Sequence, residues 1–258
     1  MFRGQTVIVT GAGYGIGRAI ARAFGREGAN VVLAARSRDK LAAVADELRA
    51  MGTDPSFEVT DVTSEASVES AIAHTLSRYG AIDVLVNNAG IAGPTKLARD
   101  VSADEWNETV GVNLTGAFYC AKHVAAAMMA RKRGCIVNIA SVAGRMAYQL
   151  RSPYAASKWG LIGFSHSLAA ELAPHGIRVN AVLPGATAGE RMERVIATRA
   201  EREGKSNDET RAGYLKDVPM GRMITEAEVA EAVLFLASDA ASGLTGQAIA
   251  VDGGYRMQ

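Results

Sequence analysis

The chain has 258 residues, of which 48% are hydrophobic and 21% charged, and its formal net charge is +1. This balance is typical of a folded protein of one or two domains, and it lacks the basic stripe by which proteins bind nucleic acid or a membrane surface. We therefore expect neither partner. No apolar run approaches the ~20 residues that span a bilayer, and no signal peptide opens the sequence, so a cytoplasmic location is expected.

Short apolar runs alternate with amphipathic segments along the whole chain. The runs predict strands at 5–11, 30–36, 55–62, 82–90, 134–141, 176–185 and 246–254. Helical spacing predicts helices near 16–28, 38–52, 65–79, 103–130, 153–174 and 226–238. Strands that are apolar on both faces and alternate with helices indicate a parallel sheet covered on both sides. The expected fold is α/β, a doubly wound sheet of about seven parallel strands in one domain over 1–258.

Two features stand outside this alternation. Residues 186–223 are dense in both charges, contain no strand pattern and are too long for a simple connection. They read either as a solvated surface helix or, because they follow the carboxyl end of the sixth strand, as a substrate lid. Cys120 and Cys135 lie in apolar surroundings and form neither a disulfide framework nor a metal-ligand pattern, so no metal is expected.

A glycine-rich turn, TGAGYGIG at 10–17, follows the first strand and opens the first helix. Glycines permit a tight turn and let a pyrophosphate approach the backbone, while the helix N-terminus offers free N–H groups. The turn therefore predicts a dinucleotide phosphate site at Gly11, Tyr14, Gly15, Ile16 and Gly17.

The end of the second strand predicts which dinucleotide binds. A carboxylate at this place selects NAD, whereas an arginine accommodates the 2′-phosphate of NADP. Residues 34–38 read AARSR and contain no acid, and the fork of Arg36 suits a phosphate. NADP is the favoured cofactor, and NAD stays possible if Arg36 is only a solvated residue.

Two more strand ends complete the expected cofactor site. Asp61, next to Val62, ends the third strand and either accepts a hydrogen bond from the adenine amine or caps the following turn. Asn88, Ala89 and Gly90 end the fourth strand, where their bend would pass close to the cofactor.

The stretch SPYAASK at 152–158 suggests the chemistry. Ser152 and Pro153 suit the start of a helix, which places Tyr154 and Lys158 one turn apart on one face. A free phenol has a pKa of about 10, and a neighbouring ammonium lowers it. The pair is therefore a candidate acid/base group, although an isolated Tyr-x-x-x-Lys is more often an exposed surface pair.

Six short motifs occur together and in order: TGAGYGIG at 10–17, NNAG at 87–90, VN at 112–113, NIASVAG at 138–144, YAASK at 154–158 and PG at 184–185. In this combination the chain resembles a classical short-chain dehydrogenase/reductase from Val7 to Gly254. The resemblance implies a single-domain Rossmann-type fold and hydride transfer between a nicotinamide cofactor and a carbonyl or secondary alcohol.

The resemblance also implies roles for individual residues. Tyr154 would be the general acid/base, Lys158 would lower its pKa and bind the nicotinamide ribose, Ser141 would hydrogen-bond the substrate oxygen, and Asn113 would hold a relay water. Further cofactor contacts would come from Pro184, Gly185 and Thr187.

The chain departs from the family pattern at two positions. Gly189 stands where a threonine often contacts the nicotinamide amide, a contact for which Thr187 is a substitute. Tyr14 stands where NADP enzymes often carry a basic residue.

Several readings of the substrate and assembly stay open. The substrate class is a ketone, sugar or 3-oxoacyl compound, and Arg145 and Arg151 are candidates for receiving an anionic group. Family resemblance implies a homotetramer or homodimer built on the helices near 103–130 and 153–174. The alternatives are an NAD-linked catabolic alcohol or sugar dehydrogenase and a non-catalytic dinucleotide sensor, although a sensor needs no proton relay.

Overall fold

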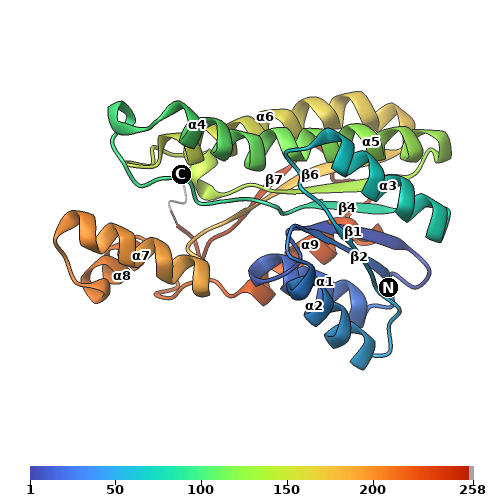
Figure 1. Cartoon of the computed structure of the whole chain (residues 1–258), viewed down its shortest axis with the longest axis horizontal. Helices are drawn as coiled ribbons and strands as arrows, with labels where there is room; N and C mark the ends of the chain where they lie inside the picture. Colours follow the sequence, from blue (N-terminus) through green and yellow to red (C-terminus); the bar gives the residue numbers. More distant parts are fainter. Residues whose placement is uncertain (256–258) are drawn as a thin grey trace.

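A computed structural model describes residues 1–255 and contains a seven-stranded sheet in which every neighbouring pair of strands is parallel (Figure 1). The order across the sheet is β3-β2-β1-β4-β5-β6-β7. The strands are β1 Thr6–Thr10, β2 Asn30–Ala35, β3 Ser56–Val59, β4 Val84–Asn87, β5 Gly134–Ile139, β6 Ile177–Pro184 and β7 Ala248–Val251. The prediction of a doubly wound sheet of about seven parallel strands is confirmed.

Helices cover both faces of this sheet (Figure 1). The helices are α1 Gly15–Arg26, α2 Arg38–Ala50, α3 Glu65–Tyr79, α4 Ala103–Val110, α5 Gly116–Arg131, α6 Ser152–Leu172, α7 Glu190–Glu203, α8 Asn207–Leu215 and α9 Glu226–Ala237. Apolar residues of α1, α2 and α9 form one core with one face of the sheet. Those of α3, α5 and α6 form the second core with the other face.

Both cysteines lie inside these cores. Burial raises the pKa of the Cys120 thiol to about 12 and that of the Cys135 thiol to about 11. They therefore stay protonated and behave as small apolar side chains, as their surroundings in the sequence predicted.

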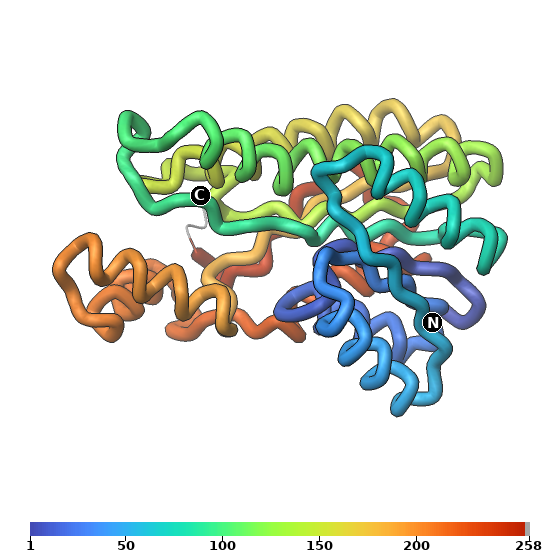
Figure 2. Tube along the Cα trace, viewed as in Figure 1, coloured from blue at the N-terminus to red at the C-terminus, as the bar shows by residue number. Residues whose placement is uncertain are grey.

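The structure differs from the predicted helices in three places. The helix expected over 103–130 is interrupted by a π turn, Gly111–Thr115, which joins α4 to α5. Helix α6 begins at Ser152, and Arg151 rather than Ser152 is its N-cap. The predicted cap was wrong because Pro153 is accommodated within the first turn, where its missing N–H leaves no helical bond unmade. The charged segment 186–223 forms two helices, α7 and α8, which lie together at one end of the molecule (Figure 2).

The strand order reverses between β1 and β4, because β2 and β3 lie beyond β1 and the remaining strands beyond β4. In open parallel sheets ligands bind outside the carboxyl ends of the strands at such a point. The glycine-rich turn follows β1 and the NNAG loop follows β4. The topology therefore brings two of the predicted cofactor segments together.

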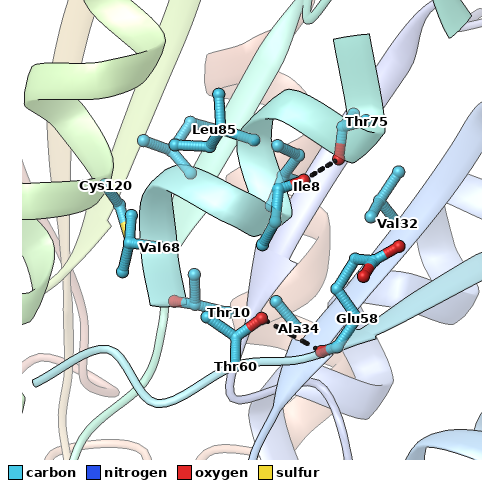
Figure 3. Close-up of a pocket in the computed structure, with 12 residues that line it drawn as sticks. Ile8, Thr10, Val32, Ala34, Glu58, Thr60, Val68, Thr75, Leu85 and Cys120 are labelled. Carbon is cyan, nitrogen blue, oxygen red and sulfur yellow. Dashed lines mark hydrogen bonds between the residues drawn. The ribbon is translucent and has the colours of Figure 1, made fainter. Parts of the chain in front are cut away.

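A separate cavity between the sheet and α3 is too small to be a site (Figure 3). It measures about 10 Å³ and is lined mainly by apolar side chains. Its threonines Thr60 and Thr75 donate to the carbonyls of Glu58 and Ala71. A space of this size holds at most one water molecule, so the cavity is a packing defect of the core.

Candidate active site

The glycine-rich turn forms a cradle at the start of α1. Gly11 and Gly15 adopt φ values of 65° and 60°, which disfavour other residues. A Cβ on Gly17 would lie 2.2 Å from the Gly11 carbonyl oxygen and 2.5 Å from Nδ2 of Asn88. The N-cap of α1, Tyr14, makes no side-chain capping bond, so the first N–H groups of α1 are left for a ligand. These features fit the pyrophosphate of a dinucleotide.

The loop after β4 is fastened to the end of β1. The amide nitrogens of Asn88 and Ala89 donate to the Thr10 hydroxyl, each at 3.0 Å. Nδ2 of Asn88 donates back to the carbonyls of Thr10 and Gly11 at 2.9 and 3.2 Å. Gly90 lies so close to α6 that a Cβ on Gly90 would be 3.7 Å from the Lys158 ammonium. The predicted residues 88–90 thus link the cofactor cradle to the predicted acid/base group.

Positive charge gathers at the carboxyl end of β2. Arg36 is exposed, and within residues 1–255 it forms no ion pair. Lys40, in the first turn of α2, places its Nζ 5.0 Å from the centroid of the Tyr14 ring and packs against Gly13. The sequence reasoning missed Lys40, because contact across two separate turns leaves no local pattern.

Asp61 and Val62 lie where the sequence predicted, at the end of β3. Oδ1 of Asp61 accepts from the Thr63 amide at 2.9 Å and from its hydroxyl at 2.8 Å. These bonds outweigh partial burial and, with the charge of Arg36, hold the pKa of Asp61 below its usual value. The turn-capping alternative for Asp61 is therefore present, and it leaves Oδ2 available to a ligand. Val62 is buried against Gly116.

Tyr154 and Lys158 lie in the first two turns of α6, with Lys158 Nζ 5.8 Å from the centroid of the tyrosine ring. Lys158 is 3% exposed, and its ammonium donates to the Ile139 carbonyl at 2.7 Å. Burial, aided by the charge of Arg191 and opposed by Tyr154, lowers the pKa of Lys158 to about 8. The ammonium is therefore charged at neutral pH but close to its titration.

The electrostatic surroundings of Tyr154 favour its phenolate. Burial acts to raise the pKa of Tyr154, but the charges of Lys158, Arg191 and Arg151 and a hydrogen bond from Ser141 outweigh it. The net effect is a pKa below the ordinary value of 10. The predicted activation by Lys158 is present, and two arginines add to it.

Ser141 and Asn113 approach this pair from β5 and from the π turn. Ser141 is buried, and its Oγ accepts from the Ala143 amide at 3.1 Å, which leaves its proton to donate. The side chain of Asn113 is fully engaged: Oδ1 accepts from the Ile91 amide at 2.7 Å, and Nδ2 donates to Ile91 and to the Ser157 hydroxyl. Asn113 therefore positions the loop after β4. Because its side chain is engaged, a water bound to Asn113 would have to hydrogen-bond its main-chain groups.

The chain leaves β6 through Pro184 and Gly185 and enters the charged segment 186–223, where the Thr187 hydroxyl donates to the Gly185 carbonyl at 3.2 Å. Gly189 has a φ of 145°, and a Cβ on it would lie 2.6 Å from Oε1 of Glu226. A threonine is thus excluded from this position by both backbone and neighbour. Glu226, at the start of α9, was not predicted, because nothing local relates it to Gly189.

A cleft of about 370 Å³ is lined in part by Arg151 and Arg191, the two arginines that flank the Tyr154 ring. It is lined by Tyr14, residues 90–95 and, from α7 and the N-cap of α6, by Arg191, Arg194, Val195, Thr198 and Arg151. Arg145 is exposed, donates to the Ala248 carbonyl and, within residues 1–255, does not line this cleft, so its binding of an anionic group stays a prediction. Arg191 was missed because 186–223 holds many arginines, and no pattern marks the one that turns inward.

Neither a metal-binding cluster nor a membrane-spanning helix occurs in residues 1–255. This region holds no group of three or more His, Cys, Asp or Glu side chains that could bind a metal ion. Nor does it hold a helix long and apolar enough to cross a membrane.

A phenol activated by a buried ammonium, beside a dinucleotide cradle at the switch point of a parallel sheet, defines an NAD(P)-dependent oxidoreductase. The chain belongs to the short-chain dehydrogenase/reductase family. The family model described as enoyl-(acyl carrier protein) reductase matches residues 11–256.

Similar proteins agree over nearly the whole length. The 3-oxoacyl-[acyl-carrier-protein] reductase FabG of Escherichia coli is 43% identical over 256 residues, which are 99% of either chain. A putative ketoacyl reductase of granaticin polyketide synthase from Streptomyces violaceoruber is 41% identical over 249 residues, covering 96% of this chain and 91% of that one.

Solved structures match the fold of this chain closely. A variant of actinorhodin polyketide ketoreductase with NADPH has a TM-score of 0.95 at 38% identity and covers both chains fully. NAD⁺-bound xylitol dehydrogenase has a TM-score of 0.96 at 33% identity, with 98% of this chain and 99% of that chain covered.

Proposed function

We propose that this protein reduces a carbonyl compound with NADPH, and that Tyr154 supplies the proton. The observation that carries the proposal is the Tyr154–Lys158 pair: the charge of Lys158, with those of Arg191 and Arg151, lowers the pKa of the phenol, and both arginines line an open cleft. Similarity to FabG and to a putative ketoacyl reductase supports the reductive direction. The NAD-linked dehydrogenase is the alternative.

The chain's own residues fit the cofactor. Gly11, Tyr14, Gly15, Ile16 and Gly17 would hold its pyrophosphate on the first turn of α1, where free N–H groups meet negative charge. The adenosine side would lie against Arg36, Asp61 and Val62, and the nicotinamide side against 88–90, Pro184, Gly185 and Thr187. When bound, NADPH supplies the hydride.

The protein performs the proton transfer. The Tyr154 hydroxyl donates its proton to the carbonyl oxygen, while the Ser141 hydroxyl donates a hydrogen bond to the same oxygen and stabilises its developing charge. Lys158 and Arg191 stabilise the phenolate that is left. Lys158 then returns a proton to Tyr154, and a water held near Asn113 would replenish it.

The charges at the end of β2 distinguish the two cofactors. Solved structures of the same fold carry NADPH in one case and NAD⁺ in another, so the fold alone does not decide. Arg36 lacks a carboxylate partner within residues 1–255, and no acid occupies 34–38. A guanidinium in this position suits the 2′-phosphate of NADP.

The test is a titration of NADPH and NADH into the wild type, Arg36→Ala and the control Arg49→Ala, whose arginine pairs with Asp46 on α2. We expect NADPH to bind at least tenfold more tightly, and Arg36→Ala to remove about 10-fold to 100-fold of its affinity while NADH is unchanged. NADH binding as tightly as NADPH would instead favour the NAD-linked dehydrogenase. Binding without turnover on any ketone or alcohol would favour the sensor.

The finer predictions on assembly belong to the same proposal. Helices α7 and α8 would act as the lid that excludes water during the reaction. Exposed Trp106, Phe118 and Trp159, on α4, α5 and α6, would be covered in a homotetramer or homodimer. A cytoplasmic location, without nucleic-acid or membrane partners, stays a prediction.

A further inference from the structure

Two arginines stand beside Tyr154 without a counter-ion. The guanidinium carbon of Arg151 lies 5.1 Å from the centroid of the Tyr154 ring, and that of Arg191 lies 5.9 Å from it. In the part of the chain that the structure describes, neither forms an ion pair. By contrast Arg194, which also lines the cleft, pairs with Glu190 at 2.9 Å.

Arg151 has donors that nothing in the described chain uses. The residue is 6% exposed, and its Nη2 donates to the Ala92 carbonyl at 2.6 Å. Its Nε is buried and has no hydrogen-bond partner within residues 1–255. A buried guanidinium with an unmade bond costs stability, and a ligand that accepted this bond beside Tyr154 would remove that cost.

Arg191 approaches the same space from α7. Its Nη1 donates to the Gly90 carbonyl at 3.4 Å, a long bond between two residues that line the cleft. Among residues 1–255, no aspartate or glutamate lines the cleft. The cleft is therefore cationic, and two of the guanidinium groups that line it form no ion pair within residues 1–255.

We propose, building on the reductase function above, that the substrate is an oxo acid whose carboxylate binds Arg151 and Arg191 while its carbonyl faces Tyr154. The free Nε of Arg151 suits one carboxylate oxygen, and a planar guanidinium binds carboxylates with charge-assisted hydrogen bonds. Both guanidinium carbons lie within 6 Å of the tyrosine ring centroid, so the carboxylate must be a few bonds from the carbonyl. A short 2-, 3- or 4-oxo acid meets this condition.

The test compares each acid with its uncharged methyl ester: pyruvate, acetoacetate and levulinate against methyl pyruvate, methyl acetoacetate and methyl levulinate. The readout is the ratio of kcat/KM for acid over ester in each pair. Both arginines also lower the pKa of Tyr154, and that effect acts on acid and ester alike, so it cancels in the ratio. We expect a ratio of at least ten for one chain length in the wild type.

Arg151→Gln and Arg191→Gln should each lower that ratio about tenfold or more, the loss expected for a charge-assisted hydrogen bond. The matched control is Arg202→Gln, on the same helix as Arg191 but outside the cleft, and it should keep the ratio. The Kd of NADPH should stay within about threefold in both cleft variants. A large rise in that Kd would instead assign the arginines to the cofactor phosphates and overturn the proposal.

A second measurement does not need turnover. The three acids are titrated calorimetrically into the NADP⁺ complex, which cannot reduce them. Binding by the wild type that both glutamine variants lose supports the oxo-acid site even if no reduction is found, in which case the reductase function fails alone. Reduction of the esters with a ratio near one in all three pairs overturns the oxo-acid site and leaves the reductase function standing.

Discussion

The contact between Gly17 and Gly11 gives a sharp prediction for the variant Gly17→Ala. A methyl group at position 17 would lie 2.2 Å from the Gly11 carbonyl oxygen, which is backbone, and 2.5 Å from Nδ2 of Asn88. Ordinary contacts need more than 3 Å, so the turn must open or α1 must move by about 1 Å. Forcing an extra methyl group into a packed site costs about 1–3 kcal/mol.

The expected loss has two readouts. For a chain of this size each kcal/mol lowers Tm by roughly 2–4 °C, so Gly17→Ala should melt roughly 2–12 °C below the wild type. Since the same turn presents the N–H groups of α1, NADPH affinity should fall by about tenfold or more. Differential scanning fluorimetry and NADPH fluorescence measure these two quantities.

A matched glycine gives the control. Gly213 lies within α8, and a Cβ there would meet no atom within 4 Å. Gly213→Ala should therefore stabilise the protein by about 0.5–1 kcal/mol through helix propensity and leave NADPH binding unchanged. If Gly17→Ala also keeps its Tm and its NADPH affinity, the argument from close approach is refuted.

Three other variants test the rest of the site. Tyr154→Phe should lower kcat for reduction by about 10²–10⁴ while the Kd of NADPH changes less than about threefold; retained activity would remove Tyr154 from its role. Reduction needs protonated Tyr154 and charged Lys158, so activity should be lost as pH rises through the pKa of Lys158, about 8. Arg191 lowers both pKa values, so Arg191→Gln should move this alkaline limb to higher pH, and a shift to lower pH would contradict the assignment. Trp159→Glu on the exposed face of α6 should reduce the mass measured by light scattering, and an unchanged mass would exclude that face as an interface.

The fold was predictable because buried parallel strands are short apolar runs, and the amphipathic helices between them are long enough to show their period. The π turn at 111–115 was not predictable from the local pattern, because its residues suit a continuous α-helix equally well. The start of α6 was misplaced by one residue for the same reason: Ser152 suits a cap, but Pro153 is accommodated as readily inside the first turn.

The placement of the candidate catalytic residues was predictable from motifs that each occupy one turn or one strand end, and their roles stay a prediction. Tyr154 and Lys158 are one helical turn apart, and the geometry of that turn brings them together. The residues that were missed, Lys40, Arg191 and Glu226, all act across separate elements. Gly189 is an example: the sequence shows the departure from the family pattern, but not the backbone φ of 145° or the nearby Glu226 carboxylate that accompany it.

The two ends of the site are built from different kinds of structure, and this difference has a chemical consequence. The cofactor end rests on strand ends tied by backbone contacts, such as those of Asn88 to β1. The substrate end depends on α7, which reaches the site through Arg191 and its bond to Gly90. Because the charge of Arg191 helps to lower the pKa of Tyr154, movement of α7 away from the cleft would withdraw that charge and raise this pKa. Lys158, Ser141 and Arg151 would still lower the pKa of Tyr154, so this pKa would be lowest with α7 against the cleft.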